Sequence, residues 1–188
     1  CVANTQLIRY TNFNDIAIQP AAGDAGCALG AAALLEKPLW EGPFLGYNDS
    51  LNQNPEEIAF KLLQGNVVPV INGRAEFGPR ALGNRSLLCL PTDVNITKLN
   101  NIKKRVNDNW RPYAPICLDY IAEDLFDIYQ PSYDMLFIAY NETDKFKTHD
   151  DTARLQLVNS KSNAFLNKIL EITTNKGEPI LINTSLNA

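Results

Sequence analysis

The sequence predicts an α/β fold, or its α+β variant, in which helices flank a mixed sheet. Short apolar runs typical of buried strands alternate with helical segments that carry their own start and stop residues. The composition agrees, because 45% of the 188 residues are hydrophobic and 20% are charged, as in ordinary globular proteins. A chain of this length can bury a core without disulfides or a structural metal.

The first third of the chain predicts two helices separated by a loop. Residues 16–36 are expected to form a strand, a glycine turn and an alanine-rich helix. Residues 37–54 are rich in Pro, Gly and Asn, which indicates a loop or a domain boundary. The next helix has clear ends, because Asn54 is a good N-cap, Pro55 fits the first helical position and Gly65 can terminate it.

The remainder predicts the sheet and its covering helices. Residues 67–71 are expected to form a strand in which Pro69 indicates an edge position or a bulge, since proline cannot donate to a neighbouring strand. Further strands are expected at 86–90, 113–118, 135–140, 154–158 and 179–183, and helices at 95–105 and 163–177.

Cysteine and histidine usage excludes several chemistries. The spacing of Cys1, Cys27, Cys89 and Cys117 matches neither a zinc knuckle nor a redox dithiol. Cys89 and Cys117 lie in apolar runs, so we predict reduced core residues and a cytoplasmic protein. The single histidine, His149, excludes a two-histidine zinc helix.

Both ends of the sequence look like cuts within a longer chain. The sequence starts without methionine in a run that already looks structured, and it stops directly after an apolar strand. We therefore expect a fragment of a longer protein. No apolar run approaches the roughly 20 residues that span a bilayer, and no secretory signal opens the chain, so no membrane association is expected.

Positive charge is concentrated in residues 74–111. This segment holds eight basic and three acidic side chains, a local net charge of +5, whereas the whole chain carries −4 and the remainder therefore −9. The basic residues are Arg74, Arg80, Arg85, Lys98, Lys103, Lys104, Arg105 and Arg111. A positive island in a negative protein fits a small bound anion better than a long polyanion, so nucleic acid is an unlikely partner.

The loop GRAEFGPRALGNR, residues 73–85, predicts the anion site. Arginine binds phosphate or carboxylate through two parallel hydrogen bonds, and glycines let backbone N–H groups approach an anion closely. Arg74, Arg80 and Arg85 are therefore candidate ligands. The alternative for these residues is surface salt bridges and ordinary turns.

Two later segments carry further candidates. Arg111 stands beside Pro112 in a stiff segment that could hold its guanidinium in one place. Polar residues also follow the last predicted strand in the sequence LINTSLN, where Ser185 and Asn187 could bind a ligand in an α/β crevice. A solvated arginine and an ordinary polar loop are the alternatives.

The motifs GRAEFGPRALGNRSLL, NNIKKR with WRPYAP, DDTARLQLV and PILINTSLN together resemble the O-carbamoyltransferases of the NodU/CmcH type. The upstream QPAAGDAGCALGAA is similar to the end of that family's actin-like (ASKHA-type) ATPase domain. The resemblance covers nearly the whole chain in the right order. It implies that residues 1–51 are the tail of the ASKHA-type domain with a linker, and that 52–188 are a YrdC-like carbamoyltransferase domain.

The resemblance also implies the chemistry. The YrdC-like domain would make carbamoyl-adenylate from carbamoyl phosphate and ATP with Mg²⁺, and the ASKHA-type domain with Fe²⁺ would pass the carbamoyl group to a hydroxyl acceptor, as in nodulation proteins. Residues implied as catalytic are Arg80, Lys103, Arg111 and Arg154, with Ser185 and Asn187 binding substrate and Asp24 binding metal. Arg74 and Arg85 of the arginine-rich loop are also predicted to bind substrate. The family's HVDGTAR reads THDDTAR here, so we interpret His149 as a surface-loop residue.

Two other functions remain open at this point. The +5 island could belong to a non-catalytic RNA-binding module, since YrdC-like folds also occur in tRNA-modifying proteins. The same adenylate chemistry could also serve a related ligase or tRNA carbamoylation enzyme with a different acceptor.

Overall fold

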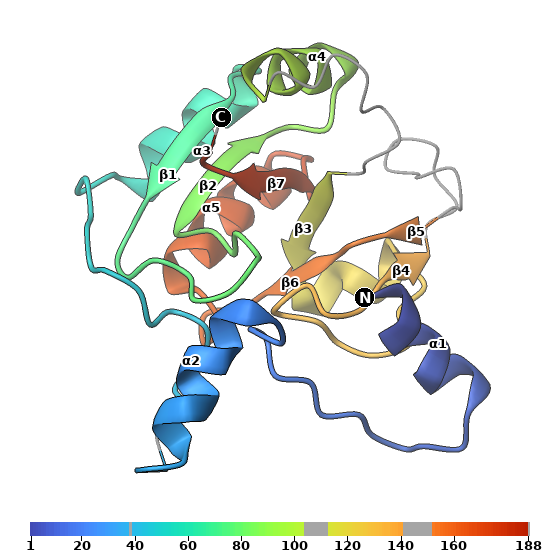
Figure 1. The fold of residues 1–188 in the computed structure, drawn as a ribbon. Coiled ribbons are helices and arrows are strands. Elements are labelled where there is room, and N and C mark those ends of the chain that lie inside the picture. The colour runs from blue at the N-terminus through green and yellow to red at the C-terminus, as the bar shows by residue number, and fades with distance from the viewer. Residues whose placement is uncertain (38, 104–112, 141–151, 188) are drawn as a thin grey trace.

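A mixed five-stranded sheet forms the centre of the molecule (Figure 1). The computed structural model describes residues 1–37, 39–103, 113–140 and 152–187. The strands are β1 (Val68–Ile71), β2 (Arg85–Cys89), β7 (Leu181–Ser185), β3 (Ala114–Leu118) and β6 (Gln156–Val158), in that spatial order. The pairs β1–β2, β2–β7 and β7–β3 are antiparallel, whereas β3–β6 is parallel. The predicted mixed sheet is confirmed.

Helices cover both faces of this sheet. The helices α3 (Pro55–Leu63) and α5 (Ala164–Asn175) pack on one face, where Leu62, Leu88, Leu170 and Leu181 belong to the main core. The helix α4 (Asp93–Ile102) covers part of the other face through Leu99. The 3₁₀ helix η1 (Asp119–Asp124) and the two-stranded sheet of β4 (Ala139–Tyr140) and β5 (Thr152–Ala153) enclose a second cluster.

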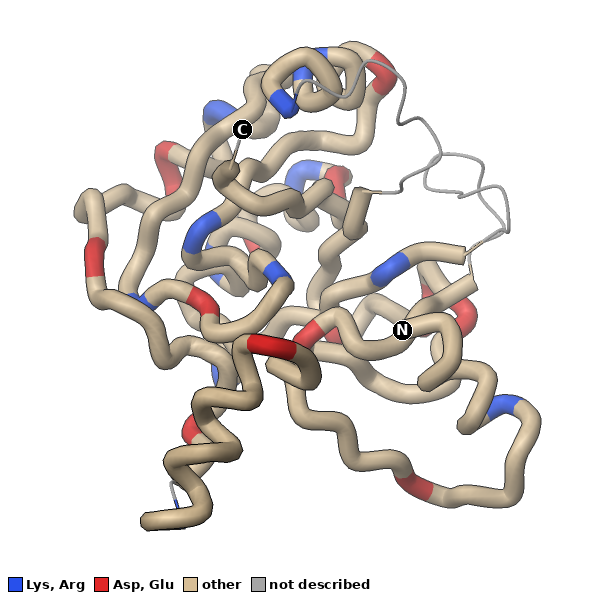
Figure 2. The backbone as a smooth tube through the Cα atoms, in the orientation of Figure 1, with Lys and Arg blue, Asp and Glu red and all other residues tan. Residues whose placement is uncertain are grey.

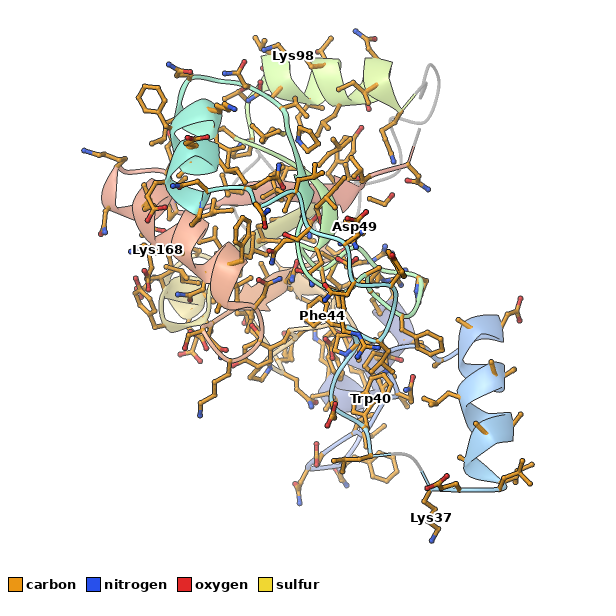
Figure 3. All side chains as sticks on the ribbon, turned by 90° about the vertical axis from the view of Figure 1, so that its left-hand side faces the viewer. Lys37, Trp40, Phe44, Asp49, Lys98 and Lys168 are labelled. Carbon is orange, nitrogen blue, oxygen red and sulfur yellow. The ribbon has the colours of Figure 1, made fainter. Side chains whose placement is uncertain are left out.

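The first two helices lie outside this layered body. The helix α1 (Val2–Tyr10) docks beside β4, and α2 (Asp24–Ala33) projects away from the sheet in both Figures 1 and 3. None of the α2 residues is buried. The predicted helix is confirmed there, but the strand predicted at its start is wrong, because residues 16–19 lie away from the sheet without regular structure.

Most other expected elements occur with shifts of one or two residues. Pro69 lies in β1, which is an edge strand of the sheet as predicted, and its carbonyl accepts from Gln53 Nε2 at 2.9 Å. The predicted strand 135–140 is wrong for all but its last two residues, since Met135 has a left-handed φ of 54° that breaks an extended chain.

Cys89 and Cys117 are free and buried in the core, as predicted. Burial raises the pKa of each thiol to about 12, so both remain protonated at neutral pH. Among the described helices, none combines the length and the apolar composition that a bilayer-spanning segment requires.

The start of α3 shows how local sequence fixes an element. Asn54 Oδ1 accepts hydrogen bonds from the N–H groups of Glu56 at 2.7 Å and Glu57 at 3.2 Å, which confirms the predicted N-cap. Asn54→Ala is expected to lower the free energy of unfolding by about 1 kcal/mol, because two N–H groups lose their acceptor. Chemical denaturation measures the change. Asn54→Asp, which keeps the acceptor, should unfold within a few tenths of a kcal/mol of the wild type; equal losses in both variants would contradict this account.

Candidate functional site

The arginine-rich loop connects the antiparallel strands β1 and β2, and Glu76 closes it at its base. Glu76 Oε1 accepts from the backbone N–H groups of Leu82 at 2.7 Å, Asn84 at 2.8 Å and Arg85 at 3.2 Å. One carboxylate oxygen therefore fixes the backbone of residues 82–85, the part of the loop that leads into β2. Sequence reasoning missed this role, although an acidic residue within an otherwise basic, glycine-rich loop was the available signal.

Buried amide side chains also bind this part of the loop, mainly through its backbone carbonyl groups. Asn183 Nδ2 donates to the Ala81 carbonyl at 2.9 Å, and Gln156 Nε2 donates to the Leu82 carbonyl at 2.9 Å. Asn183 Nδ2 also donates to Gln156 Oε1 at 2.9 Å, which joins β7 to β6. Asn163 Nδ2 adds a bond to Asn84 Oδ1 at 3.0 Å. These contacts fix the peptide units that follow Arg80.

Two predicted catalytic arginines, Arg80 and Arg154, approach the same place near Cys1. Arg80 Nη2 lies 3.6 Å from Cys1 Sγ. Burial lowers the pKa of the Cys1 α-amine, and the Arg154 and Arg80 guanidinium groups lower that pKa further by repulsion. Residues 74 positions apart in sequence therefore contribute positive charge to one partly buried region.

Arg80 is the clearest sign of a ligand in this region. Burial lowers the pKa of its guanidinium, and within the described residues its buried Nε has no hydrogen-bond partner. A partly desolvated cation with an unsatisfied buried donor is costly unless an anion meets it. The combination indicates a binding position for a phosphate or a carboxylate.

A second group forms where Lys103, Ser185 and Asn187 meet. Lys103 Nζ donates to the Ser185 carbonyl at 2.8 Å, to Ser185 Oγ at 3.2 Å and to Asn187 Oδ1 at 2.6 Å. It also contacts the Asn187 carbonyl, and Ser185 Oγ donates to Asn187 Oδ1. The structure thus brings together three residues that the sequence had placed in two distant motifs.

Strand β7 connects the two groups. Asn183 holds the carbonyl next to Arg80, and Ser185, two residues further on, binds Lys103. Side chains two residues apart in a strand point to the same face of a sheet. Arg154 precedes Gln156 by two residues, and Gln156 bonds directly to Asn183. A shared scaffold therefore carries Arg80, Lys103 and Arg154.

Arg74 and Arg85 instead bind backbone carbonyl groups of the segment before α3 and of the loop itself. Arg74 donates to the carbonyls of Leu45 at 2.8 Å and Gly46 at 3.2 Å. Arg85 donates to four carbonyls, those of Tyr47, Asn72, Gly73 and Asn84. These contacts tie residues 45–47 to the loop, and Figure 3 shows this segment, with Phe44 and Asp49 labelled, running along the body. The substrate-binding role of both arginines stays a prediction.

The basic island does not act as one unit in the structure. Figure 2 shows Lys and Arg spread over separate segments. Lys98 points outward from α4 in Figure 3, and its Nζ donates to the Gly65 carbonyl at 2.9 Å, away from the Arg80 loop. Lys104, Arg105, Arg111 and His149 lie outside the described residues.

Asp24 occupies the exposed first turn of α2. Among the described residues, no group of three or more His, Cys, Asp or Glu side chains could hold a metal ion. The residues present around Asp24 therefore do not amount to an iron site, and the Fe²⁺ prediction stays a prediction from the resemblance.

The helix α1, which sequence reasoning missed, packs against the segment that precedes β4. Thr5 Oγ1 accepts from the Ile138 N–H at 2.9 Å, and Asn4 Nδ2 donates to the Leu136 carbonyl at 2.8 Å. The Arg9 guanidinium lies 5.1 Å from the Tyr140 ring centroid and 5.4 Å from that of Tyr129. The only buried residue of α1 is the polar Thr5, which explains why no apolar pattern in the sequence indicated this helix.

The fold is α/β, and the cationic region around Arg80 is the kind of site that suits a small anion. Comparison with known families makes the assignment specific. The family described as "Carbamoyltransferase C-terminus" matches residues 59–188, and "Carbamoyltransferase N-terminus" matches residues 1–33. The chain belongs to the carbamoyltransferase family, which confirms the resemblance found in the sequence motifs.

The curated relatives include nodulation proteins and a cephem O-carbamoyltransferase. The chain is 34% identical to nodulation protein NolNO of Sinorhizobium fredii, covering 100% of the chain and 33% of the relative. It is also 34% identical to nodulation protein NolO of Bradyrhizobium diazoefficiens, covering 100% and 41%. It is 30% identical to the 3'-hydroxymethylcephem-O-carbamoyltransferase of Streptomyces clavuligerus, and the match covers 100% of the chain and 40% of the relative. The chain thus spans a third to two fifths of these relatives. The family assignment does not favour the RNA-binding alternative.

Proposed function

We propose that the chain takes part in O-carbamoyl transfer and forms carbamoyl-adenylate from carbamoyl phosphate and ATP. The family assignment and the name of the cephem O-carbamoyltransferase support carbamoyl transfer to a hydroxyl. The observation that carries the adenylation step is that Arg80 and Arg154 both bring positive charge close to Cys1, and that the buried Arg80 Nε is unpartnered among the described residues.

The reaction needs positive charge more than it needs acid–base groups. Carbamoyl phosphate, with one water, supplies carbamate and releases phosphate. A carbamate oxygen then forms a bond to the α-phosphorus of ATP, and the bond between that phosphorus and the pyrophosphate oxygen breaks. Two anions must approach and negative charge moves to the leaving pyrophosphate, so fixed cations lower the barrier through positioning and electrostatic stabilisation.

The proposed roles follow from the contacts. Arg80 and Arg154 bind the reacting anions, because both guanidinium groups carry charge into the same partly buried region. Lys103 supplies a third positive charge, whose direction Ser185 and Asn187 set through hydrogen bonds. Arg74 and Arg85 act by holding the loop and residues 45–47 in place. Mg²⁺ enters as the counter-ion of ATP, hence as part of the substrate.

Release of pyrophosphate from ATP, dependent on carbamoyl phosphate, tests the proposal. The wild-type chain with Mg²⁺ is expected to release pyrophosphate only when both substrates are present. Arg154→Ala should reduce this rate by roughly 100-fold or more, because one charge-stabilising donor is lost from the transition state.

Lys168→Ala is the matched control. Lys168 lies on the exposed surface of α5, as Figure 3 shows, and its ammonium group is 3.9 Å from Glu171 Oε2. This variant removes one exposed positive charge that is not part of the candidate site, and it should leave the rate unchanged. A wild-type chain that releases no pyrophosphate, or equal losses in the two variants, would overturn the adenylation proposal.

A further inference from the structure

The loop that carries Arg80 is restrained on both sides of that residue. On the C-terminal side, the N–H groups of Leu82 and Asn84 bind Glu76 and the carbonyl of Leu82 binds Gln156. On the N-terminal side, Gly78 has a φ of +124° and lies against Ala21, whose Cα would be 3.4 Å from an added Cβ. Arg80 is thus held between two fixed points of the backbone.

We propose that Glu76 is a positioning residue that determines where the Arg80 guanidinium is held. The carboxylate does not touch the proposed substrate; it acts by closing the loop at residues 76 and 82–85. The inference rests on the proposed function for what Arg80 binds, but the placement of Arg80 can be measured without any ligand.

The geometry gives Glu76 more influence than a surface carboxylate has. Leu82 and Asn84 are buried, so water cannot replace the acceptor for their N–H groups if the carboxylate is removed. Three N–H groups converge on one oxygen, so its loss frees several peptide units at once. Small displacements of an arginine are costly, because charge stabilisation depends on distance and alignment to the reacting anion.

Substitutions of Glu76 separate this role from general stability. Glu76→Ala removes the acceptor, whereas Glu76→Gln keeps a side-chain oxygen at the same distance along the chain. Asp119→Ala is the matched control, because Asp119 is also a partly buried carboxylate that accepts two hydrogen bonds, from Asn159 at 2.7 Å and Tyr133 at 3.2 Å, on a different element.

Two measurements on the whole chain are compared across these variants. The first is the ¹⁵N–¹H signal of Arg80 Nε together with amide hydrogen exchange at Leu82, Asn84 and Arg85. The second is the dissociation constant for carbamoyl phosphate. Glu76→Ala should shift the Arg80 signal, speed exchange at the three amides and weaken binding by about 10- to 100-fold. Glu76→Gln should bind within about 3-fold of wild type, and Asp119→Ala should leave the Arg80 signal in place.

Each result decides the inference. An unshifted Arg80 signal with unchanged binding in Glu76→Ala would overturn it, as would an equal shift in Asp119→Ala. If Glu76→Ala does not fold, Glu76→Asp, whose carboxylate is withdrawn by one methylene, takes its place with the same expected direction. If the wild type does not bind carbamoyl phosphate, the proposed function fails, and the Arg80 signal alone then decides the positioning role.

Discussion

Arg80→Ala is expected to lower the rate of carbamoyl-adenylate formation by about 100- to 1,000-fold, equivalent to roughly 3–4 kcal/mol of transition-state stabilisation. Arg80 combines burial, a pKa lowered by that burial and an Nε without a partner among the described residues. Its cation is therefore held ready for an anion at little further ordering cost. The rate of pyrophosphate release at saturating ATP and carbamoyl phosphate measures the effect.

Arg80→Lys sharpens this test. Lysine keeps the charge but cannot make the two parallel hydrogen bonds of a guanidinium, so we expect only partial recovery of the rate. A full recovery would show that charge alone matters, and an unchanged rate in Arg80→Ala would remove Arg80 from the site. Circular dichroism should confirm that both variants remain folded, since the Arg80 side chain is only partly buried.

Gly83→Ala is expected to cause the largest loss of stability, about 3 kcal/mol or more. Gly83 has a φ of +111°, and an added Cβ would lie 2.7 Å from Leu166 Cδ2 and 3.0 Å from Asn163 Nδ2. Backbone strain and overpacking against α5 therefore add together. Thermal unfolding should show a decrease in Tm of roughly 10 °C for a chain of this size.

Gly177→Ala separates the two causes. Gly177 also has a positive φ, +87°, but nothing lies within 4 Å of an added Cβ. This variant should lose only the strain contribution, about 1 kcal/mol. Equal losses at Gly83 and Gly177 would mean that contact with Leu166 contributes nothing to the requirement for glycine in the arginine-rich loop.

Local sequence signals predicted the elements with dedicated start and stop residues. Asn54 and Pro55 gave the start of α3, and Pro69 gave the edge position of β1, because each effect depends on the residue's own backbone and nearest neighbours. The strand predicted at 135–140 was wrong for the opposite reason. An apolar run indicates that a segment is buried but not that it is extended, and the buried Met135 has a left-handed backbone conformation.

For the candidate site too, the sequence predicted the chemistry and the structure showed which residues carry it. The chemistry of the GRAEFGPRALGNR loop pointed to an anion, but it could not distinguish Arg80 from Arg74 and Arg85. Only the structure shows that Arg85 donates to four backbone carbonyls while the Arg80 Nε is buried without a described partner. Which atoms an arginine meets depends on segments far away in sequence, here residues 45–47 and Cys1.

The sequence by itself determined the mixed α/β class, the family and the cationic character of the loop, because residue types, their periodicity and contiguous motifs carry that information. The tertiary structure decided that Lys103 meets Ser185 and Asn187, that Asn183 and Gln156 join their strands to the loop, and that α1 docks beside β4. Those outcomes rest on hydrogen bonds between side chains and distant backbone groups, which follow from how the elements pack and leave no periodic trace in the chain.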